Sequence, residues 1–337
     1  MGICRKIGET SIGTKELLEN HPPVYGNPFK KKIYMKARDL YLGRHAADAS
    51  DPEISISRYK PDDMVVSGAS RLAMDVQSVR GFFGYEQPKD RGTVAWYMNY
   101  ADASLFTAYA SDLFAQDEIQ CLEHPLLGGV KEYLCDVRQK GLEPLTEQEE
   151  VPTPVLIQNV PYWIHVDTAP KDKRGNTHSI YGRMFSNVSE TLLEKGITVR
   201  DAESRSNILA MSAPVYGVRA GSKYAKATIH KIMRTLLTGF GAAVQQAHET
   251  CGKDAKVEVH TGRFGCGAFG NSEALMLLSQ LVAAYKAGMD SIVFHSVNES
   301  LLEGAKRLAD GLYMSEMEEI IEIIRDQGYV RGESDGN

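Results

Sequence analysis

The sequence lacks the features that would place the protein in a membrane, outside the cell or on nucleic acid. No run approaches the roughly 18 apolar residues of a membrane-spanning helix, and no charged segment followed by an apolar one indicates a signal peptide. Lysine and arginine total 38 against 44 aspartates and glutamates, and the net charge of −6 does not favour binding to a nucleic-acid backbone. We therefore expect a cytoplasmic protein that binds neither nucleic acid nor a membrane.

Cysteine is also scarce. The five cysteines lie far apart, with no C-x-x-C pair and no spacing typical of metal ligands. Scattered thiols in odd number indicate a reducing compartment and argue against a disulfide framework. We expect no metal and no cofactor, although an acidic cluster between residues 102 and 118 keeps a Mg²⁺ or Ca²⁺ site open as an alternative.

The 337 residues are 43% hydrophobic and 24% charged, which is ordinary for a globular protein with a sizeable core. No internal repeat is visible. Residues 1–90 have several helical patterns, the clearest at 69–83, and are expected to form a helical accessory region. Residues 91–330 are expected to form the main α/β domain, and the polar segment 331–337 a disordered tail.

Short apolar segments alternate with helical patterns from residue 93 onward, as in an α/β protein. The helix expected at 119–135 is interrupted at His124-Pro125, and residues 140–154 and 167–179 read as loops. The remaining strands are expected at 93–98, 154–160, 162–166 and 207–212, and the remaining helices at 223–249, 299–312 and 314–325.

Glycine is concentrated in one stretch, residues 261–270. An apolar strand at 257–260 precedes it, a helix opens at Asn271 or Ser272, and a second apolar strand follows at 291–297, so the whole is a βαβ unit. Glycines let backbone N–H groups approach a ligand, and the helix N-terminus adds a positive dipole. A phosphate or pyrophosphate suits such a loop, although a glycine-rich connection packed on a sheet remains the alternative. The pattern is neither a P-loop nor a Rossmann fingerprint.

A cluster of acids follows the strand at 93–98. Ligands of open α/β sheets lie beyond the carboxyl ends of strands, and glycoside cleavage uses carboxyl groups to move protons. Neighbouring helical residues point about 100° apart, so at most one of Asp117 and Glu118 addresses a scissile bond. We expect Glu118 to do so, with the other carboxylates raising its pKa. Alternatively, both favour the helix dipole. The candidate catalytic residues are Asp102, Asp112, Asp117 and Glu118.

Together the two stretches resemble the poly(ADP-ribose) glycohydrolase branch of the macrodomain superfamily. The glycine stretch is similar to that family's T-G-x-W-G-C-G-A-F-G-G segment, with Phe264 in place of Trp and Asn271 in place of the last Gly. Residues 98–102 fall on the family's V-D-F-A-N, and residues 116–119 fall on Q-E-E-I at the family spacing. The resemblance spans roughly 93–294. It implies a three-layer α/β/α macrodomain with a mixed central sheet and a helical N-terminal extension.

The resemblance also implies a ligand and a set of binding residues. The ligand would be ADP-ribose, carried on an ADP-ribosylated protein, and no cofactor would be needed. Phe269 is the best candidate in the loop for stacking on a ring. The implied binding residues are Asn99, Gln116, Thr261, Gly262, Gly265, Cys266, Gly267, Ala268, Phe269 and Gly270.

Departures from the family pattern point to a particular acceptor. Residues 106–108, Phe-Thr-Ala, replace a triple glycine, Asp102 replaces an asparagine, and Asp117 replaces the first glutamate. A more acidic site suits a cationic leaving group, such as an arginine guanidinium, better than a sugar. The sequence therefore predicts a hydrolase that releases ADP-ribose from arginine. A poly(ADP-ribose) glycohydrolase, a non-catalytic ADP-ribose reader, and another glycosidic or phosphoester hydrolase on the same scaffold are the alternatives.

Overall fold

One mixed sheet forms the centre of the protein. The structure, a computed structural model, describes residues 2–45, 50–62, 74–214 and 220–335. Neighbouring strands are antiparallel from β1 to β10 and parallel from β10 to β3. In spatial order the strands are β1 (Cys4–Gly13), β2 (Glu53–Pro61), β7 (Val155–Pro161), β10 (Arg205–Ser212), β4 (Thr93–Ala101), β11 (Lys256–Thr261), β12 (Ser291–His295) and β3 (Asp75–Val79).

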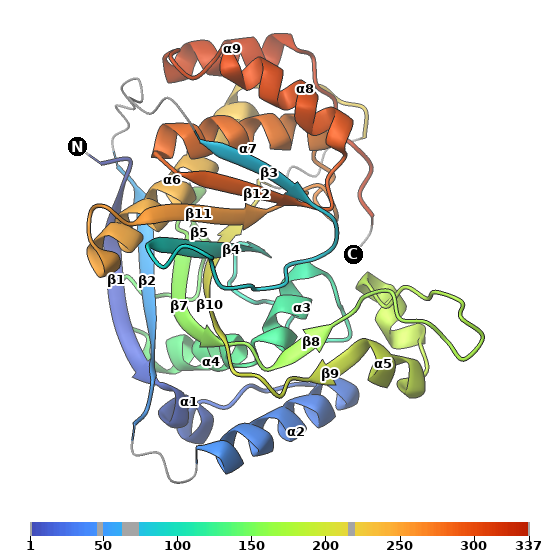
Figure 1. Cartoon of the computed structure of the whole chain (residues 1–337). Coiled ribbons are helices and arrows are strands. Elements are labelled where there is room, and N and C mark those ends of the chain that lie inside the picture. The colour runs from blue at the N-terminus through green and yellow to red at the C-terminus, as the bar shows by residue number, and fades with distance from the viewer. Residues whose placement is uncertain (1, 46–49, 63–73, 215–219, 336–337) are drawn as a thin grey trace.

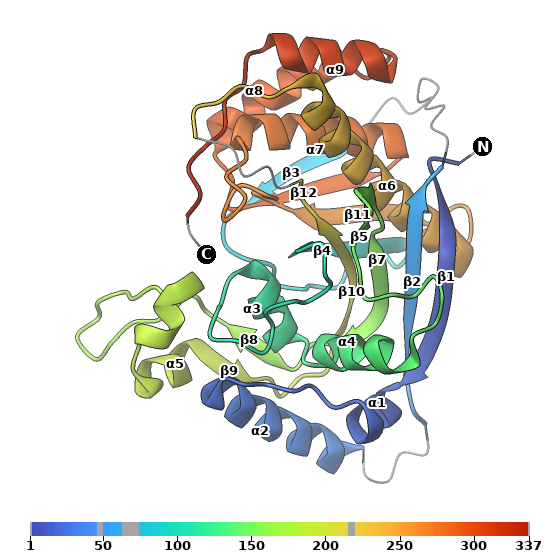
Figure 2. The same cartoon turned by 180° about the vertical axis from the view of Figure 1, so that it is seen from behind.

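Helices cover both faces of the sheet, which confirms the predicted α/β/α layering. α6 and α7 pack on one face with α8 and α9 outside them, and α1 to α4 cover the other face (Figures 1 and 2). The helices are α1 (Thr14–Asn20), α2 (Pro28–Arg44), α3 (Gln116–Glu123), α4 (Leu126–Val137), α5 (Glu190–Gly196), α6 (Lys226–Cys251), α7 (Glu273–Ala287), α8 (Glu299–Asp310), α9 (Met317–Asp326) and a short 3₁₀ helix at Gly182–Asn187.

The central strand β4 shows why the chain forms three layers. Trp96 and Met98 pack into the core under α6 and α7, whereas Ala95 and Tyr97 pack into the core on the α3 and α4 face. Side chains alternate between the faces of a strand, so a strand that is apolar at nearly every position must be covered on both sides.

Several sequence predictions are confirmed. The βαβ unit consists of β11, α7 and β12, and Ser272 is the N-cap of α7, accepting a hydrogen bond from Leu275 N. The strand at 93–98 is the start of β4, and the interruption at His124-Pro125 separates α3 from α4. Proline stops the first helix there because it lacks an N–H group and restricts the residue before it.

The N-terminal region differs from the prediction of a helical accessory region. It contains α1 and α2, but it also supplies β1, β2 and β3 to the central sheet. In the helix expected at 69–83, residues 69–73 lie outside the described residues, and 75–79 form β3. β3 is a polar, mostly exposed strand at the sheet edge, so its sequence has no apolar alternation to reveal it.

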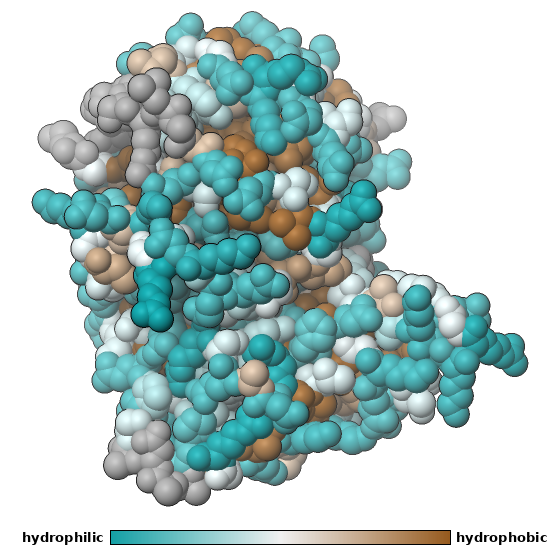
Figure 3. All heavy atoms as spheres, viewed as in Figure 1, coloured by the Kyte–Doolittle hydropathy of each residue, from teal (hydrophilic) through white to brown (hydrophobic). Residues whose placement is uncertain are grey.

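Two short strand pairs lie outside the main sheet. β5 (Glu147–Gln148) pairs with β6 (Val151–Pro152), and β8 (Ile164–Val166) pairs with β9 (Ile197–Val199). The segment from β8 to β9, which includes α5, projects from the body (Figures 1 and 2), and its surface is mostly hydrophilic (Figure 3). In the part of the chain that the structure describes, no helix is both long enough and apolar enough to cross a bilayer.

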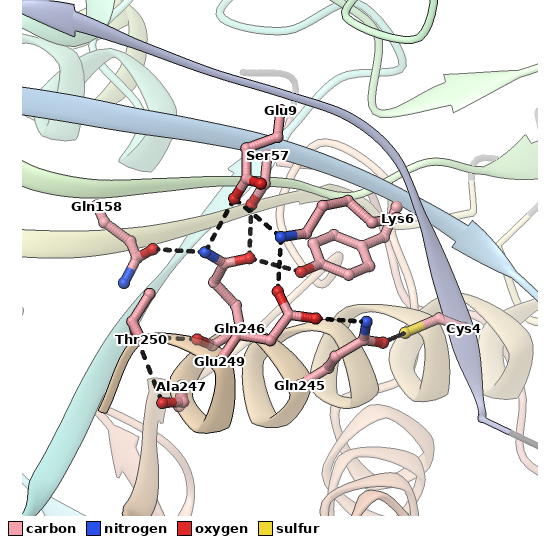
Figure 4. Close-up of polar contacts among 11 residues, drawn as sticks. Cys4, Lys6, Glu9, Ser57, Gln158, Gln245, Gln246, Ala247, Glu249 and Thr250 are labelled. Carbon is pink, nitrogen blue, oxygen red and sulfur yellow. Dashed lines mark hydrogen bonds and ion pairs between the residues drawn. The ribbon is translucent and has the colours of Figure 1, made fainter. Parts of the chain in front are cut away.

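A buried polar network joins the strands β1 and β2 to α6 (Figure 4). The Gln246 side chain is buried and accepts hydrogen bonds from Tyr59 Oη at 2.6 Å and Ser57 Oγ at 3.3 Å. Its amide nitrogen donates to Gln158 Oε1 at 2.9 Å and Glu9 Oε1 at 3.4 Å. One glutamine therefore satisfies polar groups from β1, β2 and β7, whose burial without partners would be unfavourable.

We expect Gln246→Ala to lower the free energy of unfolding by about 2 kcal/mol, because it leaves the buried Tyr59 hydroxyl without its acceptor. Chemical denaturation measures this change. The neighbouring Gln245 is only half buried, and Gln245→Ala should change stability by no more than about 0.5 kcal/mol. Equal effects of the two variants would contradict the structural role of the network.

Candidate active site

A cavity of about 460 Å³ opens where β4, β11, β12 and β3 end. These four neighbouring strands are parallel, so their carboxyl ends lie at one edge of the sheet, where ligands of open α/β sheets bind. The cavity walls come mainly from the segments that follow β4, β11, β12 and β3. Tyr181 in the projecting segment, Ala213 after β10 and Asp335 after α9 also line it. Both stretches that the sequence singled out therefore meet in one cavity.

The glycine loop supplies one wall. Gly265, Gly267, Ala268 and Phe269 line the cavity, and Gly265 has a positive φ of 70° that favours glycine. Gly262 lies close to the next strand, where a Cβ would be 2.6 Å from the His295 carbonyl oxygen.

The other predicted loop residues lie behind this wall. The Thr261 hydroxyl donates a hydrogen bond at 2.5 Å to Oε1 of Gln280, a residue of α7. The Gln280 amide nitrogen in turn donates to Gly262 O. Cys266 is buried, and its thiol donates a hydrogen bond to Phe264 O. Burial raises the pKa of this thiol to about 12, so Cys266 is a packed residue and not a reactive thiolate. Gly270, with a φ of 59°, is also outside the lining of the cavity.

Backbone N–H groups of the loop are available to a ligand. Those of Ala268 and Phe269 donate to no atom of the described residues, although both residues border the cavity. Unpaired backbone N–H groups can bind an anion, which is the role that the sequence predicts for this loop. Arg263, which forms an ion pair with Glu273 at 3.1 Å, adds a cation to the same wall.

The opposite wall is the start of α3. Gln116 fixes this start to the end of β4, because its side chain donates to Met98 O at 3.0 Å and accepts from Tyr100 N at 2.8 Å. Glu118 is buried, lines the cavity and accepts from Ala115 N at 2.9 Å, as the third residue of a helix commonly does. Burial raises the pKa of Glu118.

Asp117 is also buried and also borders the cavity. It accepts hydrogen bonds from Asn99 Nδ2 at 3.0 Å and from the Cys121 thiol at 3.6 Å. Burial, followed by the negative charge of Glu118, raises the pKa of Asp117 to about 7. Asn99 does not line the cavity, but its hydrogen bond to Asp117 positions that carboxyl group.

Lys30 is a buried cation near these acids that the sequence did not reveal. Its ammonium group donates to Leu113 O at 2.6 Å and Tyr109 O at 3.2 Å and lies over the Phe114 ring. Burial lowers the pKa of Lys30 to about 8, and the charge of Glu118 opposes this effect. Lys30 occurs in a run of three lysines on α2, which reads as a solvated face, so nothing in the pattern distinguishes it.

The two remaining acids separate. Asp102 is exposed and lines the cavity, whereas Asp112 does not line it and accepts from Asn27 Nδ2 at 2.7 Å. Asp112 therefore holds the start of α2, and its prediction as a catalytic residue is not supported by its position. Between Asp102 and Asp112 in the sequence, Phe106 has a positive φ of 50°, which is a conformation that favours glycine. The family that the sequence resembles has glycine in this stretch. Lys131 stabilises this conformation by donating to Phe106 O at 2.9 Å.

Aromatic and histidine side chains complete the cavity. Phe82 and Tyr181 face each other from distant segments, with ring centroids 6.1 Å apart. His295 also lines the cavity and contacts His260 at 3.0 Å, which in turn contacts Glu258 at 3.0 Å. Burial lowers the pKa of His295 to about 4, so its imidazole is neutral. The sequence missed Phe82 because the pattern at 69–83 predicts a helix there, and it missed Tyr181 because that residue lies in an irregular segment without a motif.

The raised pKa of Asp117 predicts a pH-dependent stability. The folded protein binds one more proton than the unfolded chain between pH 4 and pH 7, so stability should fall as pH rises through this window. The isosteric Asp117→Asn keeps the hydrogen bond from Asn99 but has no proton to lose, so it removes this fall in stability. In urea unfolding, the free energy of unfolding of the variant should rise relative to that of the wild type from pH 4 to pH 7. A constant difference across this range would contradict the raised pKa.

Comparison with known proteins finds one family model that matches part of the chain. Residues 173–304 match the family model described as poly(ADP-ribose) glycohydrolase (PARG), Macro domain fold. No curated protein sequence matches the chain. Among solved structures, PARG from Thermomonospora curvata is 14% identical with a TM-score of 0.40, covering 88% of this chain and 96% of that one. PARG from Deinococcus radiodurans in complex with ADP-ribose is 11% identical with a TM-score of 0.38, covering 90% and 95%.

The T. curvata enzyme bound to the inhibitor ADP-HPD is 15% identical with a TM-score of 0.37, covering 89% of this chain and 84% of that one. The matched segment contains the glycine loop, α7 and β12, within an α/β/α protein. Over this segment the chain is similar to the PARG family of macro domain fold.

Proposed function

We propose that the protein is an ADP-ribosyl hydrolase that cleaves the bond between the distal ribose of ADP-ribose and an acceptor. One observation carries the proposal: Glu118, a buried carboxyl of raised pKa, lies in the same cavity as a glycine loop with available N–H groups. The first is the group that glycoside cleavage needs, and the second is a site for a diphosphate. The PARG family match and the ADP-ribose and ADP-HPD complexes of the similar structures support the same ligand.

The residues divide the work between binding and chemistry. The glycine loop and Arg263 would bind the diphosphate, and the aromatic rings of Phe82 and Tyr181 offer apolar faces to a planar base. Glu118, protonated more readily because it is buried, would donate a proton to the departing acceptor and then accept one from the attacking water. The ribose would pass through an oxocarbenium-like transition state, which the negative charge of nearby carboxylates stabilises.

The acceptor has two candidates. The family match favours another ADP-ribose unit, as in poly(ADP-ribose). Asp102 favours an arginine guanidinium, because its exposed carboxylate on the cavity wall can form charge-assisted hydrogen bonds with a cation. Asp112 lies off the wall, so the case for arginine rests on Asp102 alone.

We expect Glu118→Gln to reduce turnover by about 100-fold or more while ADP-ribose still binds, since the change keeps the shape of the side chain and removes its proton. Release of ADP-ribose from modified peptides measures turnover, and calorimetry measures binding. Glu303→Gln, on α8 and outside the cavity, controls for the substitution. Full turnover in Glu118→Gln would move the acid/base role to Asp117 or Asp102. A wild type that binds ADP-ribose but cleaves no linkage would instead be a reader.

A panel of singly modified peptides and polymer decides the acceptor. If Asp102 recognises a guanidinium, the wild type should cleave the arginine conjugate faster than the serine, glutamate or polymer conjugates. Asp102→Asn should slow only the arginine reaction, by about 10-fold. Asp112→Asn carries the same charge change off the cavity wall and should leave every rate as it is. Cleavage of polymer with the arginine conjugate left intact would establish the glycohydrolase alternative.

A further inference from the structure

The segment that follows α9 lies against the glycine loop instead of forming the disordered tail that the sequence predicts. We call its described residues, Val330–Asp335, the strap. Its first part is fixed to the segment before α6: Val330 forms a β-bridge with Lys223, and the Arg331 backbone is hydrogen-bonded to Ser222 and Gly221 at 2.9 Å each. Its last part reaches the loop that binds the diphosphate in the proposed function.

Two side chains of the strap bind carbonyl groups of the loop. Arg331 is buried, lies over the Tyr224 ring and donates to Phe269 O at 3.0 Å. The Ser334 hydroxyl donates to Ala268 O at 2.7 Å. A composition rich in charge and glycine hides these contacts, because each is a specific long-range bond and not a periodic pattern.

These bonds set the direction of the loop's N–H groups. A trans peptide places its C=O and N–H on opposite sides. The bond from Ser334 to Ala268 O therefore turns the N–H of Phe269 away from the strap. This N–H is one of the two that donate to no described residue and border the cavity. The strap thus holds the loop in a form that can bind an anion.

The strap also brings a negative charge to this anion site. Asp335 lines the cavity together with Gly267, Ala268 and Phe269. A Cβ added to Gly267 would lie 2.9 Å from Asp335 Oδ2, so the carboxylate contacts the loop backbone. A bound diphosphate would lie next to a like charge, which disfavours binding.

We propose that the strap sets the anion affinity of the glycine loop, with Arg331 and Ser334 as positioning residues that orient its N–H groups and Asp335 as a carboxylate that competes with the bound anion. The proposal rests on the glycine loop being the diphosphate site of the proposed function. It implies that binding of ADP-ribose displaces the Asp335 carboxylate from the loop, while Arg331, buried and bonded on several sides, stays in place.

Binding of inorganic pyrophosphate to the full chain tests the proposal without any reaction. By calorimetry, Asp335→Asn should bind pyrophosphate about 5-fold more tightly than the wild type, with the gain shrinking at high salt. Glu333→Gln makes the same charge change two residues away, outside the cavity lining, and should alter affinity much less. Loss of fold does not raise affinity, so this gain separates the proposal from a merely structural role.

The positioning residues are tested by loss. Ser334→Ala and Arg331→Met should weaken pyrophosphate and ADP-ribose binding, Arg331→Met by about 10-fold, with adenosine binding unchanged because adenosine has no diphosphate. Arg331→Lys keeps one donor and should recover part of the affinity. If Arg331→Met fails to fold, the pyrophosphate affinities of Ser334→Ala and Asp335→Asn still test the proposal.

The outcomes separate this proposal from the proposed function. Unchanged affinity in Asp335→Asn, an equal gain in Glu333→Gln, or no pyrophosphate binding by the wild type would overturn the strap proposal. Pyrophosphate binding that responds as expected, in a protein that cleaves no ADP-ribosyl linkage, would support the strap and refute the hydrolase.

Discussion

The attachment of α3 to the end of β4 is the constraint on which the site depends. Gln116 bonds two backbone groups of β4, one on either side of Asn99, so the first turn of α3 cannot rotate or slide relative to the sheet. Asn99 then holds Asp117, and the same first turn buries Glu118. Burial is what raises the pKa of both carboxyls, so this rigid joint determines their chemistry as well as their position.

Charge compensation around these acids is partial, and it comes from a distant part of the sequence. Lys30 is the buried cation, and its ammonium group is held by two carbonyl oxygens of the segment between β4 and α3. It opposes the effect of burial on Glu118 without forming an ion pair with it. A direct ion pair would keep Glu118 ionised, whereas a cation held at carbonyl groups leaves the carboxyl able to take up and release a proton.

The parts of the fold that the sequence could predict are those with a local signal. The strand around Trp96 has apolar residues on both faces, and the βαβ unit has a glycine loop and an N-cap at Ser272. The position of Glu118 at the cavity was predictable because it follows a buried strand in an acidic segment. Lys30 and Arg331 were not, because their roles come from burial and long-range bonds to carbonyl groups. The prediction that Asp112 belongs to the site used only its closeness to Asp117 in the sequence, and that closeness does not bring Asp112 to the cavity.

The order of strands in the sheet has a consequence for the way the chain folds. β1 and β3 come from the first 80 residues yet occupy opposite edges, and β3 pairs with β12, which ends at His295. One edge therefore stays unpaired until β12 has been synthesised. Contacts so distant in sequence slow folding and leave strand edges open to other chains in the meantime. The polar, mostly exposed sequence of β3 suits this delay, since a hydrophobic edge strand exposed for so long would aggregate.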